Sequence, residues 1–309
     1  MHTRIRPGVS YWLLLLAAIP ALSQAQHSSG PPTPEVLQVR AGVAALGRNW
    51  NSQVLEQTAK LYLPLHRQRP TAGIRQTPDI SYGPLAQQKL DLFAPDQGFD
   101  ELGPVIIFLH GGAATGGDKV LPGTDGLLYG NVARALARAG GIGINANYRA
   151  GSKGRSGAED VRRVVEWTLK NAAQYGGDPK SIIVLGHGEG AAHLASYLFD
   201  QAAQPKEGPG ITGAILSSGT LGRPGSKPLD LVENYQGPVV PVLLWSADLD
   251  PVENGMSELR DKLCRRYGNC PDYALLAGHN HISAIMSFDS ADMSAMGSLI
   301  RFYHSVVRK

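Results

Sequence analysis

The segment from Ser181 to Ser196, Ser-Ile-Ile-Val-Leu-Gly-His-Gly-Glu-Gly-Ala-Ala-His-Leu-Ala-Ser, places the tightest constraint on how this chain can fold. Its apolar start at 182–185 predicts a strand buried on both faces, and its Ala- and Leu-rich end predicts a helix. Gly186, Gly188 and Gly190 join the two, and residues this small let the backbones of strand and helix nearly touch. The segment therefore predicts a strand–turn–helix unit of an α/β sheet.

The spacing of this turn is that of a motif that presents a catalytic residue. In Gly-x-Ser-x-Gly, a strained turn between strand and helix exposes a serine hydroxyl at the top of the sheet. The central residue here is Gly188, which has no hydroxyl. A glycine-rich turn without any chemistry is the alternative interpretation. A phosphate-binding loop is disfavoured, because the spacing is not Gly-x-Gly-x-x-Gly and no P-loop lysine follows.

Strand and helix patterns alternate along the rest of the chain. Apolar runs predict strands at 80–83, 88–93, 104–109, 143–147, 211–216, 239–246 and 273–276, and apolar periodicity predicts helices at 129–139, 158–174, 257–263 and 291–306. We therefore expect an α/β fold with a mainly parallel central sheet flanked by helices, its first two strands an antiparallel edge pair. With 309 residues, 43% of them hydrophobic, one large domain can span 80–309. Residues 26–79 are expected to form a helical segment packed on its core, and 219–237 a loop or cap over the active-site face.

The N-terminus has the pattern of a signal peptide. Arg4 and Arg6 precede an apolar stretch at 11–22, and Ser23-Gln-Ala25 offers small residues at the positions that a signal peptidase reads. We expect residues 1–25 to be removed and the protein to be exported, in the periplasm or outside the cell. An uncleaved membrane anchor is the alternative, although the apolar stretch is short for a membrane span.

Cysteine content and charge limit the partners of the chain. Its two cysteines, Cys264 and Cys270, lie six residues apart, and in an oxidising compartment such a pair predicts a disulfide. They lack the further ligands that a zinc site needs, so we expect no metal. A net charge of +3 with both signs interspersed gives no reason to expect nucleic-acid binding. After signal cleavage we expect no membrane association, and the sequence does not indicate an oligomeric state.

A glycine turn after the predicted strand at 104–109 is suited to stabilising an oxyanion. His110-Gly111-Gly112-Ala113 follows that strand directly, and glycines there let backbone N–H groups approach a substrate carbonyl. We predict an oxyanion hole at Gly111, Gly112 and Ala113. The amide of Glu189, just after the turn at Gly188, would complete it.

Acid and base candidates follow the last two predicted strands. Asp248 and Asp250 lie after the strand at 239–246, and we favour Asp250 because its place in the loop would let its carboxylate reach a histidine; either could instead stabilise a turn. His279 and His281 follow the strand at 273–276, and we favour His281 because it lies deeper in that loop. His110, His187 and His193 need no catalytic role.

Taken together, these motifs resemble those of the α/β-hydrolases, in particular the His-Gly-Gly carboxylesterases related to hormone-sensitive-lipase-like and kynurenine-formamidase-like enzymes. The resemblance runs from about Tyr82 to the C-terminus and rests on motifs in a shared order: His110-Gly-Gly, Gly116-Gly-Asp-Lys119, Asn147-Tyr-Arg149, Gly176-Gly-Asp-Pro179, the turn at 186–191, Asp250-Pro251 and Gly278-His-Asn-His281. It implies hydrolysis of small esters or related amides without metal or cofactor, with Asp250 as acid, His281 as base and Gly112 with Ala113 in the oxyanion hole. Ala113 in place of a third glycine is a minor departure; Gly188 in place of the nucleophilic serine is the decisive one.

The missing serine leaves three hypotheses for the activity. The chain could be an esterase scaffold that is weakly active or inactive for want of its nucleophile, a non-catalytic protein that binds an acyl or aromatic ligand, or a hydrolase in which His281 activates water directly. Other hydroxyls in the region are poor substitutes. Ser196 lies two helical turns further on, and Ser217 and Ser218 follow a different predicted strand.

Overall fold

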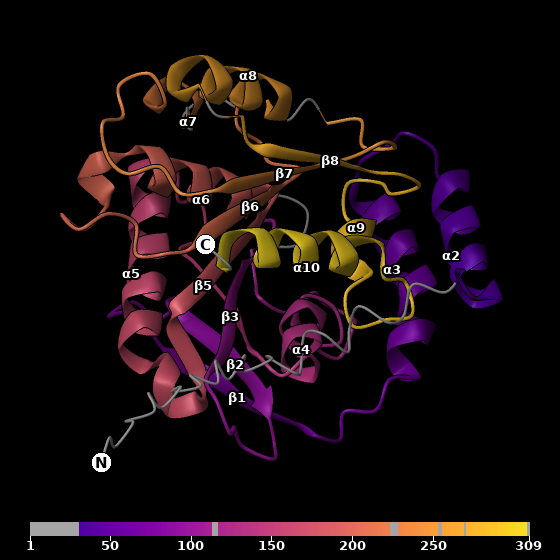
Figure 1. The fold of residues 1–309 in the computed structure, drawn as a ribbon. Helices are drawn as coiled ribbons and strands as arrows, with labels where there is room; N and C mark the ends of the chain where they lie inside the picture. The colour runs from indigo at the N-terminus through magenta and orange to yellow at the C-terminus, as the bar shows by residue number, and fades with distance from the viewer. Residues whose placement is uncertain (1–30, 113–116, 223–227, 253–254, 269, 308–309) are drawn as a thin grey trace, which may run out of the picture.

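An eight-stranded sheet runs through the centre of the molecule, in the order β1-β2-β4-β3-β5-β6-β7-β8. The computed structural model describes residues 31–112, 117–222, 228–252, 255–268 and 270–307. Its strands are β1 Ile74–Ser81, β2 Lys89–Pro95, β3 Gly103–Leu109, β4 Ile142–Ala146, β5 Gly177–His187, β6 Gly213–Ser217, β7 Val242–Ala247 and β8 Asp272–Leu276 (Figure 1). The predicted signal segment, 1–25, lies outside the described residues.

The sheet is parallel except at one edge. β3 to β8 pair in parallel throughout, whereas β2 pairs antiparallel with β1 and with β4. Every residue of β3, β4 and β6 is buried, as expected of parallel strands covered on both faces. The predicted α/β class, with a mainly parallel sheet flanked by helices, is confirmed.

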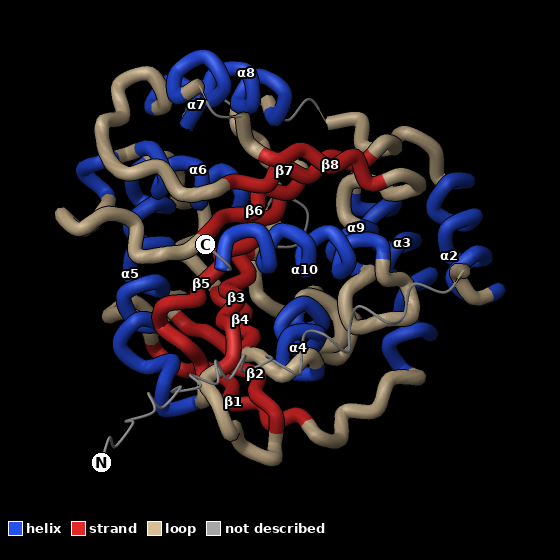
Figure 2. The backbone as a smooth tube through the Cα atoms, in the orientation of Figure 1, coloured by secondary structure: helices blue, strands red, loops and turns tan. Residues whose placement is uncertain are grey.

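Helices cover both faces of the sheet (Figures 1 and 2). Side chains of α5, α6, α7 and α8 pack into the core on one face, and side chains of α2, α3, α4, α9 and α10 pack into the core on the other. The alternation along β3 shows the division, because Val105 and Ile107 belong to the first core while Ile106 and Phe108 belong to the second. The helices are α2 Pro34–Ala45, α3 Ser52–Arg67, α4 Gly130–Arg138, α5 Arg155–Asn171, α6 Glu189–Phe199, α7 Pro228–Leu231, α8 Met256–Tyr267, α9 Ser283–Met286 and α10 Ser294–Val307, with short 3-10 helices at Ala172–Tyr175 and Gln201–Ala203.

The N-terminal segment forms more than helices. α2 and α3 lie within the expected helical region, and α3 begins after Asn51, whose side chain accepts a hydrogen bond from the Val54 N–H at 2.9 Å. The first strand, however, begins at Ile74, earlier than the predicted start at residue 80. It is an exposed edge strand with an irregular register between Thr77 and Ile80, so its residues do not show the clean apolar alternation that identifies a strand.

Among the described residues of 219–237, where a loop or cap is predicted, α7 is a short helix whose Leu229 packs into the core. The sequence predicts neither α7 nor α9, because four residues are too few for a periodic pattern to stand out. None of the helices within the described ranges is both long and apolar enough to span a membrane.

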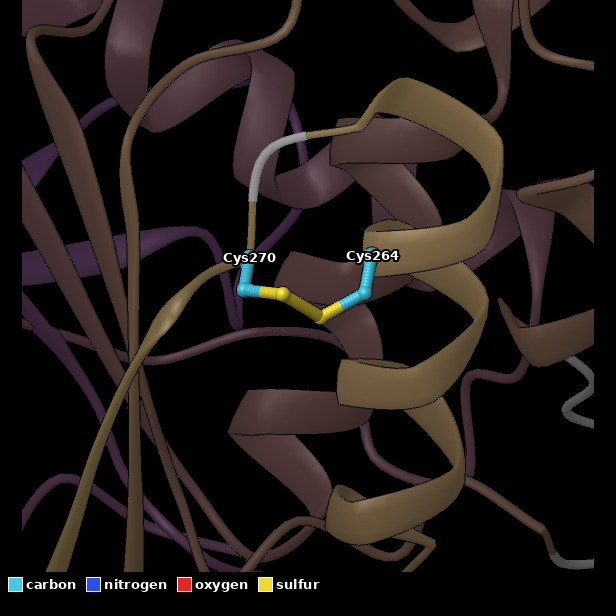
Figure 3. Close-up of a disulfide and its surroundings, with 2 residues drawn as sticks. All are labelled: Cys264 and Cys270. Carbon is cyan, nitrogen blue, oxygen red and sulfur yellow. A yellow bond between two sulfur atoms is a disulfide. The ribbon is translucent and has the colours of Figure 1, made fainter.

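A disulfide joins Cys264, near the end of α8, to Cys270, just before β8 (Figure 3). The predicted pairing is thus confirmed. It closes the short connection between the helix and the last strand, with the two Cα atoms 4.3 Å apart.

Candidate active site

The turn at Gly188 has the backbone of a nucleophile elbow. β5 ends at His187, α6 begins at Glu189, and between them Gly188 has φ 56° and ψ −114°. The neighbouring glycines are needed for close packing, since a Cβ on Gly186 would lie 2.6 Å from the carbonyl oxygen of Gly190. Positive φ is strained for any residue with a side chain. The chain therefore keeps a conformation that an ordinary turn would not require.

The base and acid candidates come together after β7 and β8. His281 Nδ1 lies 3.0 Å from Asp250 Oδ2, and both side chains are buried. Asp250 Oδ1 also accepts the N–H of Val252 at 2.9 Å. Burial raises the pKa of Asp250, but the hydrogen bond and charge of His281, with the Val252 amide and the Ser218 hydroxyl, outweigh it and lower the pKa below its ordinary value. Asp250 is thus held as a carboxylate beside the imidazole.

The imidazole of His281 faces the elbow. An ideal Cβ on Gly188 would lie 3.6 Å from His281 Nε2 and 3.6 Å from the Cα of Gly111, which is ordinary van der Waals distance. A hydroxyl carried by that Cβ would fall within hydrogen-bonding reach of Nε2. The structure therefore places the imidazole of His281 between the predicted nucleophile position and the predicted acid. Gly188 follows β5, Asp250 follows β7 and His281 follows β8, each at the carboxyl end of its strand.

The competing candidates have other partners. Asp248 Oδ1 accepts the N–H groups of Gly278 and His279, at 2.8 and 3.2 Å, so it shapes the turn after β8. The ring nitrogens of His279 lie 2.9 Å from Ser283 Oγ and 2.7 Å from Ser294 Oγ. These contacts occupy Asp248 and His279 in holding the loop that carries His281.

Two nearby serines are hydrogen-bonded to other residues, and a third is buried within α6. Ser217 Oγ lies 3.3 Å from His187 Nδ1, Ser218 is hydrogen-bonded to Asp250, and Ser196 is buried in α6. Among the residues that the structure describes, no hydroxyl is hydrogen-bonded to His281 Nε2. His187 is itself kept neutral, because burial and then the charge of His281 lower its pKa well below the ordinary value.

The glycine turn after β3 is fixed from behind. His110 Nε2 lies 2.9 Å from Asn147 Oδ1, and Tyr148 donates its hydroxyl to the His110 carbonyl at 2.8 Å. The His-Gly-Gly and Asn-Tyr-Arg motifs are therefore two parts of one support, which sets Gly111 and Gly112 beside the elbow. Ala113, also predicted for the oxyanion hole, lies outside the described residues. Glu189 follows Gly188 directly, and its side chain reaches back toward Gly112.

The N-terminal segment, mainly the connection between α2 and α3, supplies site residues that the motifs did not indicate. The ring of Trp50 lies 4.3 Å from that of His281, and Arg48 donates to the backbone carbonyl of Asp250 at 3.3 Å. Asn280, next to His281, donates to Thr58 of α3 at 2.8 Å. The sequence signal for them is Trp50 itself. It stands in a short polar connection at 47–51, where no apolar pattern predicts a core position for so large an apolar side chain.

Comparison with known proteins agrees with this architecture. Residues 90–204, which run from β2 to the end of α6 and its following turn, match the BD-FAE family. This chain has the α/β-hydrolase fold and is similar to esterases. The esterase LipQ of Mycobacterium tuberculosis is 34% identical over 143 residues, 45% of this chain and 32% of that protein. The cholinesterase of Mus musculus is 30% identical over 132 residues, 39% of this chain and 20% of that protein. The match thus spans a third or less of these two curated relatives.

Solved esterases share the fold of this chain over most of its length. Esterase B from Lactobacillus rhamnosis superposes with a TM-score of 0.61 at 16% identity, covering 88% of this chain and 96% of that one. The Pyrobaculum calidifontis esterase gives a TM-score of 0.60 at 18% identity, covering 89% and 98%. At such identities the likeness establishes the fold and leaves the chemistry to the residues of the site.

Proposed function

We propose that this α/β-hydrolase binds a small carboxylic ester or related amide at the elbow and turns it over slowly or not at all, because Gly188 provides no nucleophile. One observation carries the proposal. The Cβ position of Gly188 lies 3.6 Å from His281 Nε2, with Asp250 on the opposite ring nitrogen. That is the arrangement in which a serine would be activated by the imidazole and the imidazole oriented by the carboxylate.

The test is to supply the missing hydroxyl. Gly188→Ser should raise hydrolysis of p-nitrophenyl acetate by about 10²-fold or more over the wild-type chain, since a triad acts as a unit and without its nucleophile only the residual rate from binding and the oxyanion hole is left. Gly188→Ala is the matched control, because it adds the same Cβ at the same positive φ without the oxygen. A folded Gly188→Ser variant with the wild-type rate would contradict the proposal.

The retained Asp250–His281 pair favours a second candidate for any activity of the wild-type chain. With its Nδ1 held by Asp250 and Nε2 facing the elbow, His281 can act as a general base on water. His281→Ala should then abolish wild-type turnover. Turnover that survives this substitution would exclude the mechanism in which His281 activates water.

We further propose that the protein is exported, with residues 1–25 removed after Ala25. The charged and apolar pattern of the N-terminus supports this, as does the Cys264–Cys270 disulfide, since such bonds persist in oxidising compartments. N-terminal sequencing of protein recovered from the periplasm or medium should begin at Gln26. Protein found only in the cytoplasm with its original N-terminus would contradict export.

A further inference from the structure

The side chain of Glu189 lies against the predicted oxyanion hole. Glu189 is the first residue of α6, and a Cβ added to Gly112 would overlap with its carboxylate. That same added atom would lie 3.3 Å from the Tyr148 hydroxyl, so the carboxylate, the hydroxyl and the Gly112 backbone meet at one place. With the carboxylate in this position, a side chain at residue 112 would displace it.

Two described neighbours of the Glu189 carboxylate are a tyrosine and a histidine. Burial, and then the charge of Glu189, raise the pKa of the Tyr148 hydroxyl well above its ordinary value. His193 lies on the next turn of α6, with Nε2 3.8 Å from Glu189 Oε1. Burial lowers the pKa of His193 to about 4, so this imidazole is neutral at pH 7 and does not cancel the carboxylate.

Acyl transfer develops negative charge at this position. In a serine hydrolase the backbone N–H after the nucleophile and those of the glycine turn stabilise an oxyanion. The N–H after the elbow here belongs to Glu189 itself, whose carboxylate lies against the glycine turn. A like charge a few ångströms away opposes that stabilisation, and more strongly where water is excluded.

We propose that Glu189 is a specificity-determining residue that makes the site select against negative charge and accept neutral or cationic ligands. The inference rests on the proposed function in placing the ligand carbonyl between Gly112 and Glu189. It gives the site a second departure from an acyl-transfer enzyme, independent of Gly188, and it defines the ligand class by charge.

Binding to the chain with Gly188 unchanged tests this proposal without any turnover. Benzoate, benzamide and benzamidine are planar ligands of similar shape that are anionic, neutral and cationic, and calorimetry can measure each. Glu189→Gln should strengthen benzoate binding by about tenfold or more and weaken benzamidine binding, because removing one nearby charge changes only charged ligands strongly. Benzamide affinity should change little. Glu101→Gln, at the opposite end of β3 and exposed, is the control for a change in net charge.

The outcomes separate this proposal from the proposed function. If benzoate binds Glu189→Gln no more tightly than the wild type, or is bound by neither, the role of Glu189 is wrong. Adding Glu189→Gln to Gly188→Ser should also raise p-nitrophenyl acetate hydrolysis by about tenfold over Gly188→Ser alone. If both serine variants are folded and inactive, the proposed function fails while the benzoate comparison still decides the role of Glu189.

Discussion

The two sides of the candidate site match an acyl-transfer site to different extents. On the side formed after β7 and β8, Asp250 and His281 keep a buried hydrogen bond, and the second oxygen of the carboxylate is held by the Val252 amide. On the side formed after β3 and β5, the backbone keeps the strained elbow, but Gly188 contributes only hydrogen and Glu189 brings a carboxylate. Replacing Asp250 or His281 would leave a buried hydrogen-bonding group without its partner, which costs stability. A glycine in place of a serine at position 188 carries no such cost.

The largest effect is expected when the base, His281, is removed from a variant in which the nucleophile has been restored. In the Gly188→Ser background, His281→Ala should lower kcat for p-nitrophenyl acetate by about 10³-fold or more, because an unactivated serine is a poor nucleophile. Steady-state kinetics measure it. His279→Ala, which removes the neighbouring histidine of the same loop, is the control. The same loss of kcat in this variant would contradict the assignment of His281 as the base.

The acid–base side should also contribute to stability. Asp250→Asn should lower the free energy of unfolding at pH 7 by about 1–3 kcal/mol, because it weakens a buried, charge-assisted hydrogen bond to His281. Urea denaturation measures this loss. The exposed Asp100→Asn is the control and should leave the midpoint unchanged within error.

The same substitution has a predicted pH dependence. The folded pKa of Asp250 is lowered, so its contribution is fully present above its unfolded pKa of about 3.9 and is lost as pH falls through the folded value. The stability difference between wild type and Asp250→Asn should therefore shrink on acidification below about pH 4. A difference that stays constant down to the acid transition would mean that Asp250 is not held as a carboxylate.

The elbow side should lose stability when a side chain is added at Gly188. Gly188→Ala should destabilise the fold by about 1–2 kcal/mol, because its φ of 56° is strained for any residue with a Cβ even though the space is open. Gly222→Ala, where nothing lies within 4 Å of the added Cβ and φ is not positive, should have little effect. Equal effects of the two substitutions on the melting temperature would contradict the strain at the elbow.

The smallest effect is expected from the N-terminal contribution. Trp50→Ala removes the aromatic ring that lies 4.3 Å from His281, and should weaken benzamide binding by about fivefold, the effect of losing one aromatic contact. Trp50→Phe should recover most of the affinity. Full affinity in Trp50→Ala would show that the ligand does not contact this side of the site.

The sequence predicted the sheet and its mainly parallel strands, because continuous apolar runs identify strands that are buried on both faces. It did not locate the start of β1, which is an exposed edge strand, and it missed α7 and α9, which are too short to show a helical period. Asp250 and His281 could be singled out because each follows a strand whose carboxyl end must lie at the same edge of the sheet.

What the sequence could not give was how side chains from distant segments meet. Trp50 and Arg48 reach His281 and Asp250 only because α2 and α3 pack on the core beneath the last loops. The direction of the Glu189 side chain depends on the space at Gly112, which is a property of the assembled turn. No sequence motif identifies either of these contacts.

Labelling with a fluorophosphonate most directly tests whether the acid–base pair is poised around position 188. The reagent forms a bond only with an activated serine, and peptide mass spectrometry identifies the residue that carries it. The account predicts that Gly188→Ser is labelled at residue 188, and that the wild-type chain and Gly188→Ala are not labelled. A labelled serine elsewhere in the wild-type chain, or a folded Gly188→Ser variant that remains unlabelled, would contradict it.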